Sequence, residues 1–539
     1  MCSFYKEYNE TLHTSIPHRN QPDMPEHLRT LIVILVLSTV VFAFAHRPAC
    51  SITGTGNFTR RRNLWFALTL AAFLAHNFWV YTFIAILLLI YANLRETNPP
   101  ALFFFILFAL PMSHIPISGM GLINIFFNLS HARILELLIL LPAFFVLIRR
   151  SGTLAFGRTW PDMVLGVYML LTAILYLRET SVTDTLRQAF YLFIDVFLPY
   201  FVISRSLKDL QAFREALLSI VLAIMVIALL AIFETTKHWL LYHSLIGVLE
   251  LEGSLDYLGR DGKLRAIVTA GHPIALGYLI AAGMGLYLFL QRSIRKKFVR
   301  WLGMALLAAG LIAPLSRGPW IGAVVLLAVF TATGRYAVRR LMSLAVAAVL
   351  ALSLIAVLPG GERVTNLLPF IGKTEQGSIQ YREKLITNSM IVIERNPWFG
   401  SIDYLSTPEM KAMRQGQGII DTVNTYIGVT LETGIVGLGL FVGFFALTLL
   451  GIYRAMRSIR DRGSEERLLG RAIFATLLAI LVMIFTVSSI SFIPIVYWSV
   501  AGLGVAYAQM IRRGGKVKKI MAPHKDSGLM RTSEHSAKI

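Results

Sequence analysis

Three arginines and one histidine stand where they could handle a phosphorylated substrate. Arg317 lies in SRGPW, between two apolar runs that are separated by almost no loop. Arg265 and His272 lie in LRAIVTAGHP, and Arg382 lies in YREKL. A guanidinium group binds two phosphate oxygens at once, and an imidazole exchanges a proton near neutral pH. These residue types favour a site for a diphosphate beside a reacting hydroxyl group.

Each of these residues also has a purely structural explanation. Arg317 could be a cation at the membrane edge, with its aliphatic stem in the apolar layer. His272 precedes a proline that opens a helix, so it could cap that helix. Arg382 and Glu383 could form the solvated face of a surface helix.

No motif for a metal ion or a nucleotide accompanies these residues. The chain contains no HExxH, no CxxC and no GxxxxGK[ST], and no DxD pair falls in a candidate external loop. Cys2 and Cys50 are too few and too far apart for a disulfide framework. The sequence therefore predicts chemistry without a metal ion or another cofactor.

The elements that must position these residues are apolar helices. Of 539 residues, 56% are hydrophobic and only 15% are charged, whereas soluble proteins have about 25% charged residues. Runs such as 31–45, 163–177 and 217–233 are almost wholly apolar. Lipid cannot satisfy backbone polar groups, so such runs are helical, and about 20 residues cross a bilayer. The predicted fold class is all-α: a polytopic transmembrane helical bundle of about 14 spans.

Basic side chains collect in a few short loops. The formal net charge is +21, and residues 291–300 contribute five basic and no acidic side chains. Cytoplasmic loops are enriched in Lys and Arg, so 291–298 and 453–469 are predicted to be cytoplasmic. The longer connections 234–269 and 359–422 are nearly balanced in charge and are predicted to be periplasmic. The charge therefore indicates the membrane topology of the chain and argues against a nucleic-acid surface.

The spans and loops predict an order of segments along the chain. The order is a cytoplasmic N-terminal segment 1–29, N-terminal transmembrane helices 30–186, a transmembrane core 187–358 with the loop 234–269, a long periplasmic loop 359–424, C-terminal transmembrane helices 425–512 and a basic cytoplasmic tail 513–539. The run 64–93 is taken as one span, which leaves the arginines at 60–62 outside. Dividing that run into two spans would place the N-terminus on the opposite side of the membrane.

The long loop contains a predicted amphipathic helix that would lie on the membrane surface or over the mouth of the bundle. Proline at Asn396-Pro397 removes a helical donor and ends it. Its apolar residues recur at spacings of about three and four: Ile379, Leu385, Ile386, Met390 and Ile393.

The segment DTVNTYIGVTLETGIVGL (421–438) opens the next span. Asp421 or Thr422 is its predicted N-cap. Glu432 lies inside the apolar run, where an unpaired carboxylate is costly. Gly434 and Gly437 predict a kink or a re-entrant turn.

Four segments in a fixed order resemble a known family. They are RAIVTAGHPIALG, SRGPW, YREKLITNSMIVIERNPWFGS and VNTYIGVTLETGIVGL. This arrangement resembles the O-antigen ligase and polysaccharide polymerase superfamily over roughly residues 187–510. The pattern of that family is an Arg before a His-Pro, an SRG turn, an Arg-led loop helix ending in NP-x-x-G, and a His-Asn-x-Tyr ahead of a glycine-rich span.

The resemblance implies a metal-independent glycosyltransferase with its site on the periplasmic face. Its donor would be an oligosaccharide on undecaprenyl diphosphate. Its acceptor would be a lipid A core sugar in a ligase, or another lipid-linked repeat unit in a polymerase. Arg265, Arg317 and Arg382 would bind the diphosphate and neutralise the leaving group. Asn424 and Tyr426 fall on the Asn-x-Tyr of the family and would contact substrate.

One position departs from the family pattern, because Val423 replaces the histidine of His-Asn. This departure favours a polymerase of the exopolysaccharide or capsule type. A helix over 421–432 would turn Asp421 away from the face of Val423. His272 is therefore the predicted catalytic base beside the catalytic Arg317, with Glu383 and Asp421 as alternatives.

Two other functions remain open at this level. A lipid-linked glycan flippase would also be polytopic and basic, but transporters more often show inverted repeats, which this sequence lacks. A non-catalytic subunit of a polysaccharide assembly complex is the other alternative. The predicted partners are the lipid-linked oligosaccharide, a glycan or lipid-linked acceptor, membrane lipids and other polysaccharide export or assembly proteins, without nucleic acid.

Overall fold

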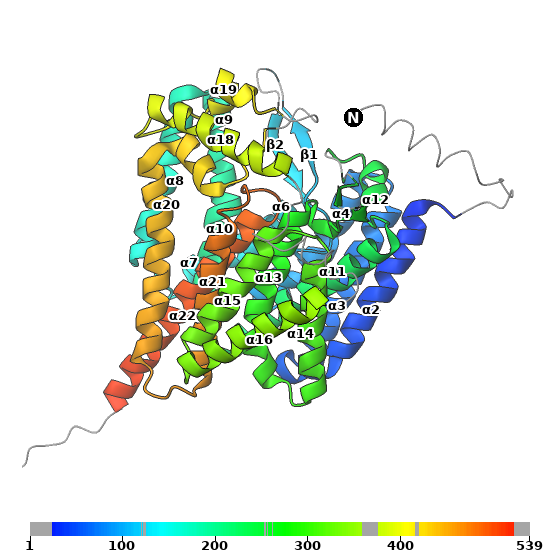
Figure 1. The fold of residues 1–539 in the computed structure, drawn as a ribbon, viewed down its shortest axis with the longest axis vertical. Coiled ribbons are helices and arrows are strands. Elements are labelled where there is room, and N and C mark those ends of the chain that lie inside the picture. The colour runs from blue at the N-terminus through cyan, green and yellow to red at the C-terminus, as the bar shows by residue number, and fades with distance from the viewer. Residues whose placement is uncertain are drawn as a thin grey trace, which may run out of the picture.

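The computed structural model describes residues 24–119, 121, 125–252, 255, 257–260, 262–357, 376–414 and 420–521. Over these ranges the molecule is a bundle of helices capped at its upper end by two short hairpins and a surface helix (Figure 1). The helices of the bundle are α2 (Glu26–Thr53), α3 (Thr55–Leu74), α4 (Phe78–Asn93), α5 (Pro99–Ile106), α6 (His131–Leu135), α7 (Leu141–Arg149), α8 (Trp160–Glu179), α9 (Val182–Tyr191), α10 (Leu198–Ser206), α11 (Leu210–Lys237), α13 (Pro273–Leu290), α14 (Lys297–Ile312), α15 (Arg317–Ala332), α16 (Ala337–Val357), α20 (Thr425–Ser458), α21 (Glu465–Met483) and α22 (Ile493–Met521).

Smaller elements gather at the upper end. They are the hairpin β1 (His114–Ser118) and β2 (Ile125–Ser130), the helix α12 (His243–Val248), the hairpin β3 (Gly259–Arg260) and β4 (Lys263–Leu264), the surface helix α18 (Gln376–Arg395) and the short α19 (Pro408–Lys411). The long connection 359–424 is described only in part, because 358–375 and 415–419 lie outside the described ranges.

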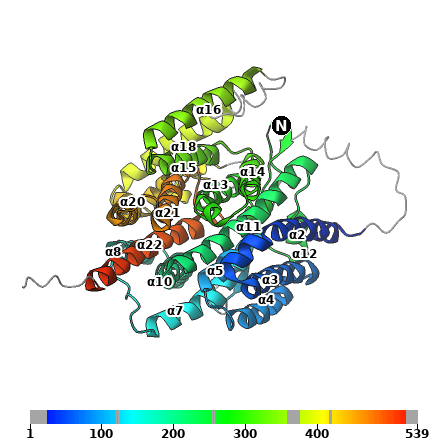
Figure 2. The ribbon, with the colours of Figure 1, turned by 90° about the horizontal axis from the view of Figure 1, so that it is seen from below.

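Eight helical stretches of the described chain are long and apolar enough to cross a membrane, and α4 and α15 are shorter apolar helices. The predicted class, a mostly helical multi-pass membrane protein, is confirmed, and the number of about 14 spans stays a prediction. At the centre, α13 is buried on nearly every side, which is why its sequence is apolar all round. Viewed from below, α2, α3 and α4 lie on one side of α11 and α13, and α16 and α20 lie on the other (Figure 2).

The run 64–93 forms two helices, so its interpretation as one span is wrong. The chain turns between α3 and α4, where His76 has a φ of 52°. Asn77 caps α4 by accepting a hydrogen bond from the Trp79 backbone N–H at 2.8 Å. The polar His-Asn pair thus supplies the turn and the cap that divide the apolar run.

This division places the N-terminal arginines at the basic end of the bundle. Arg61 is buried and forms an ion pair with Glu96 at 2.7 Å. It also lies 3.6 Å from the carboxylate of Glu215, near the start of α11. At the same end, Arg214 pairs with Glu465, and Arg292 donates to the Gly463 carbonyl at 2.8 Å. The arginines therefore lie beside the basic loops predicted to be cytoplasmic.

The start of α2 lies at the opposite end. The indole N–H of Trp239 donates to the Glu26 carboxylate at 2.9 Å, so the start of α2 adjoins the loop 234–269. The segment 1–29 is predicted to be cytoplasmic and the loop 234–269 to be periplasmic. These two predictions conflict, because the start of α2 lies beside that loop. The division of 64–93 into α3 and α4 adds one helix between them and accounts for the conflict. Residues 1–23 lie outside the described residues.

We expect the start of α2 to face the periplasm together with the long loop. In a background with Cys2 and Cys50 replaced by serine, Met24→Cys and Ser378→Cys should react in whole cells with a membrane-impermeant thiol reagent that crosses only the outer membrane. Ser464→Cys should react only after the inner membrane is opened. Labelling of Ser464→Cys in whole cells, with Met24→Cys protected, would contradict this orientation.

Candidate active site

Two arginines hold the tight turn between α14 and α15. Arg265 follows the β3–β4 hairpin, and its Nε donates to the Pro314 carbonyl at 3.1 Å. Its Nη2 donates to the Ser316 hydroxyl at 2.9 Å, and the Arg260 guanidinium donates to the Leu315 carbonyl. The turn ends at Arg317, the first residue of α15. The structure thus brings Arg265 and Arg317 together across 52 positions of sequence.

His272 lies beside Arg265 at the start of α13 and caps that helix. Its Nδ1 accepts a hydrogen bond from the Ile274 backbone N–H at 3.3 Å. Burial, and secondly the charge of Arg265, lower the pKa of His272 to about 4, and the nearby Asp421 carboxylate opposes this shift. His272 is therefore neutral at pH 7, with its single proton on Nε2, because Nδ1 accepts. The helix cap engages Nδ1, so Nε2 is the ring nitrogen left to meet a substrate, and the role of His272 as base stays a prediction.

Asp421 lies in an irregular segment before α20. Its Oδ1 accepts hydrogen bonds from the Val423 backbone N–H at 2.9 Å and from the Ser488 hydroxyl. Val423 has a φ of 50°, and the helix begins only at Thr425. The expectation that a helix over 421–432 turns Asp421 away is therefore wrong, because residues 421–424 precede the helix.

The predicted N-cap is also displaced. Asn424 caps α20 in place of Asp421 or Thr422, with its side-chain oxygen accepting from Tyr426 N–H at 2.9 Å. The Tyr426 hydroxyl donates to the Leu481 carbonyl at 2.8 Å. Asn424 therefore caps the start of α20, and Tyr426 ties that start to α21.

The connection from α21 to α22, residues 484–492, joins the parts of the site. The Thr425 N–H donates to the carbonyls of Ile484 and Val487, each at 3.0 Å. The Ser491 hydroxyl donates to the Ala270 carbonyl at 2.7 Å, next to His272. Gly318 approaches Thr486 so closely that a methyl group there would collide with it. This connection was missed in the sequence, although the hydroxyl run TVSSIS (486–491) interrupts its apolar surroundings.

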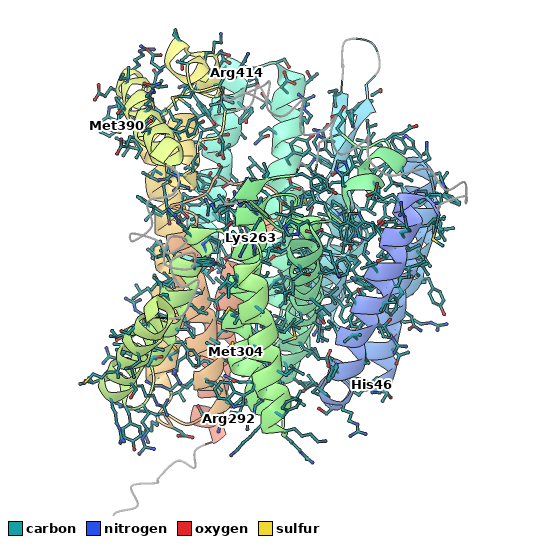
Figure 3. The ribbon with its side chains drawn as sticks, turned by 45° about the vertical axis from the view of Figure 1, so that its right-hand side comes forward. His46, Lys263, Arg292, Met304, Met390 and Arg414 are labelled. Carbon is teal, nitrogen blue, oxygen red and sulfur yellow. The ribbon has the colours of Figure 1, made fainter. Side chains whose placement is uncertain are left out.

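The surface helix α18 covers the segment that contains Asp421. The Tyr381 hydroxyl donates to the Asp421 carbonyl at 3.1 Å, and Leu385 and Val392 pack on α19 and the first turns of α20. Arg382 is half-buried next to Tyr381, whereas Glu383 is exposed. The predicted apolar face is correct for Leu385 and Ile393, but Ile386 and Met390 are each 50% exposed. The side chain of Ile379 lies outside the described residues. Figure 3 labels Met390 and Arg414 at this upper end, above Lys263 of β4.

The NPWFG loop joins α18 to a kink in α20. Gly434 has a φ of 68° and interrupts the helix, as predicted, whereas Gly437 is helical. The carbonyls of Pro397 and Trp398 accept from the N–H groups of Ile435 and Val436, at 2.8 and 3.2 Å. A methyl group on Gly434 would collide with the Trp398 carbonyl. The kink thus frees backbone groups that the loop then satisfies.

Two glutamates of the apolar helices support this arrangement: Glu234 is buried in α11, and Glu432 is half-buried in α20. The Glu234 carboxylate, at the end of α11, accepts the N–H groups of Leu241, Ile267 and Val268 at 2.9–3.0 Å. It fixes the path of the chain between Arg265 and His272. Glu432 has a hydrogen-bond partner in the Tyr176 hydroxyl of α8, so its carboxylate is not unpaired inside the apolar run.

The described residues contain no group of three His, Cys, Asp or Glu side chains that could hold a metal ion. The site places the arginines Arg265 and Arg317 near the carboxylate of Asp421, at the upper end of an apolar bundle. A comparison with protein families matches residues 302–442 to the family described as O-antigen ligase. The similarity to O-antigen ligases thus covers this segment of the 539-residue chain. No curated protein matches the chain.

The matched segment contains the SRG turn, α18, the NPWFG loop and the kinked start of α20. Arg317, Arg382, Asn424 and Tyr426 lie inside the matched residues, and Arg265 and His272 precede them. The predicted resemblance is therefore confirmed. Members of the family are glycan ligases and polymerases, which supports a role for this membrane protein in polysaccharide biosynthesis.

We expect Glu234→Gln to loosen the Arg265–His272 segment. An amide carries an NH₂ group in place of one oxygen, so at least one of the three backbone donors loses its acceptor, at a cost of about 1–3 kcal/mol. The melting temperature of the purified protein should fall. Thr236→Val is the control, because among the described residues its exposed hydroxyl bonds to the Phe233 carbonyl of its own helix alone. Equal melting temperatures for the two variants would show that Glu234 does not hold the segment.

Proposed function

We propose that the protein is an inner-membrane glycosyltransferase. It polymerises or transfers oligosaccharide from undecaprenyl diphosphate at the periplasmic face, in exopolysaccharide, capsule or O-antigen synthesis. The observation that carries the proposal is the meeting of Arg265, the SRG turn with Arg317, His272 and Asp421 around one connection between α21 and α22.

In the proposed reaction, the oxygen of an acceptor hydroxyl attacks the anomeric carbon of the donor. The bond between that carbon and the diphosphate oxygen breaks, and its electron pair leaves with the diphosphate. The products are a new glycosidic bond and undecaprenyl diphosphate. Arg265 and Arg317 bind the diphosphate and stabilise the charge that develops on it, with Arg382 reaching the same group from α18.

Within this reaction, Asp421 replaces His272 as the proposed base. Among the described residues, only the Val423 N–H and the Ser488 hydroxyl donate to the Asp421 side chain, both to Oδ1. Oδ2 is thus left to take the proton of the acceptor hydroxyl. Neutral His272 donates its Nε2–H to a substrate oxygen. Asn424 and Tyr426 shape the site through the backbone of α20.

Arg317→Lys tests the proposal most simply. Lysine keeps the charge but loses the planar fork, so transfer should fall by about 10²–10³-fold, as when one donor to a developing oxyanion is lost. The readout is polymer formed per unit of inserted protein, together with the accumulation of single lipid-linked repeat units on the periplasmic side. Near-normal polymer would make Arg317 a membrane-edge anchor. Repeat units accumulating on the cytoplasmic side in a deletion strain would instead indicate a flippase.

The base assignment makes a separate prediction. Asp421→Asn should lower the rate by about 10²–10⁴-fold, whereas Glu383→Gln, on an exposed position, should be mild. Because the pKa of His272 is near 4, its neutral form persists as the pH falls from 7 to 5. The rate should therefore show no loss centred near pH 6.5, the ordinary histidine value. A loss near pH 6.5 that disappears in His272→Gln would return the role of base to His272.

A further inference from the structure

An apolar recess lies far from the candidate active site, near the basic end of the bundle. It has a volume of about 260 Å³ and is lined by α2, α11, α13 and α14. Ala45 and Pro48 of α2 face Leu222 and Met225 of α11 across it. The Tyr287 hydroxyl, a polar group in the lining, donates to the Arg300 carbonyl at 3.0 Å. The recess therefore offers its occupant apolar contacts.

The recess opens towards the surrounding lipid. Val40 and Phe44 of α2 line it and are 43% and 59% exposed, respectively. Side chains that are both exposed and part of a concave lining contact whatever lies in the bilayer next to the protein. A single hydrocarbon chain suits such an opening, because it fills the apolar space with van der Waals contacts that an empty recess lacks.

Basic side chains stand at the rim of this recess. Ile294 and Val299 belong to the lining, and Arg295, Lys296 and Lys297 lie between them in the chain and are exposed. In the described part of the protein, these three residues form no ion pair with a carboxylate. Figure 3 labels Arg292 of the same loop and His46 of α2 at this lower end of the bundle, below Met304 of α14.

We infer that this recess binds one anionic phospholipid, with an acyl chain between α2 and α14 and the phosphate on Arg295, Lys296 and Lys297. An apolar recess with a cationic rim matches a lipid with an apolar chain and an anionic head. The occupant differs from the lipid diphosphate of the proposed reaction, because the Arg265–Arg317 site lies at the opposite end of the bundle. The inference therefore goes beyond the proposed function and does not depend on it.

The site would fasten the N-terminal helices to the rest of the bundle. The recess separates α2 from α13 and α14, and α2 packs on α11 and α3. A bound chain would fill this space at the level of Ala45, and its phosphate would neutralise part of the charge of the basic loop. Lipid composition would thus affect the stability of the N-terminal helices.

The test is native mass spectrometry of the purified full-length protein in a neutral detergent. The protein is titrated with dioleoyl phosphatidylglycerol or with dioleoyl phosphatidylcholine, which share their chains and differ in head-group charge. The wild type should bind its first phosphatidylglycerol at a concentration at least about fivefold lower, since one cation near the head group contributes about 1 kcal/mol. The variant Arg295→Gln, Lys296→Gln, Lys297→Gln changes only exposed side chains and should lose this preference.

A matched pair of variants tests the recess itself. Ala45→Phe places a ring in the recess and should weaken the first binding of both lipids by at least about fivefold. Ala43→Phe adds the same ring at an exposed position of α2 outside the lining and should bind both lipids like the wild type. Melting temperatures equal to that of the wild type establish that both variants are folded.

Three binding results would overturn the inference, and so would one result on oligomeric state. The binding results are equal affinity of the wild type for the two lipids, equal binding by Ala45→Phe and Ala43→Phe, and displacement of phosphatidylglycerol by stoichiometric undecaprenyl phosphate, which would make the recess a polyprenyl site. A protein dimer that only Ala45→Phe disrupts would equally assign the recess to a second copy of the chain.

Discussion

The hydrogen bonds from arginine to the turn between α14 and α15 are the interaction on which the site depends. Arg265 and Arg260 both donate to this turn, and the turn sets where α15 and Arg317 begin. Positive charge gathered at one turn attracts an anionic group, and a diphosphate presents several oxygens to it at once. This turn, residues 314–316, therefore fixes the position of α15 relative to the β3–β4 hairpin and the start of α13.

A second constraint fixes the other half of the site. The kink at Gly434 interrupts a long apolar helix, and the NPWFG loop satisfies the backbone groups that the kink frees. Arg178 and Glu179 at the end of α8 bind the same loop, through the Gly400 carbonyl at 3.0 Å and the Ser401 hydroxyl at 2.9 Å. The surface helix α18 is thereby held above Asp421. The NPWFG loop and the kink at Gly434 therefore hold each other in place.

Much of this arrangement could be predicted from short motifs, and the rest depends on contacts between distant residues. Arg265, Arg317 and the kink at Gly434 were recognisable because each has a local signature. The surroundings of His272 and Asp421 were not, because they depend on the backbone N–H that the His272 ring accepts and on the left-handed backbone at Val423. Glu234 was missed because an isolated carboxylate at the end of a helix looks solvated in the sequence. The division of 64–93 depended on one polar pair, His76-Asn77, inside an otherwise apolar run.

The central claim is that the Arg265–Arg317 turn recognises a lipid diphosphate. Isothermal titration of the purified protein with undecaprenyl diphosphate and with undecaprenyl monophosphate tests it directly, because the two ligands share their tails. The account predicts that the diphosphate binds more tightly, and that Arg265→Gln or Arg317→Lys removes this difference while binding of the monophosphate changes little. Equal affinity of the wild type for the two ligands, or a preference that survives both substitutions, would contradict it.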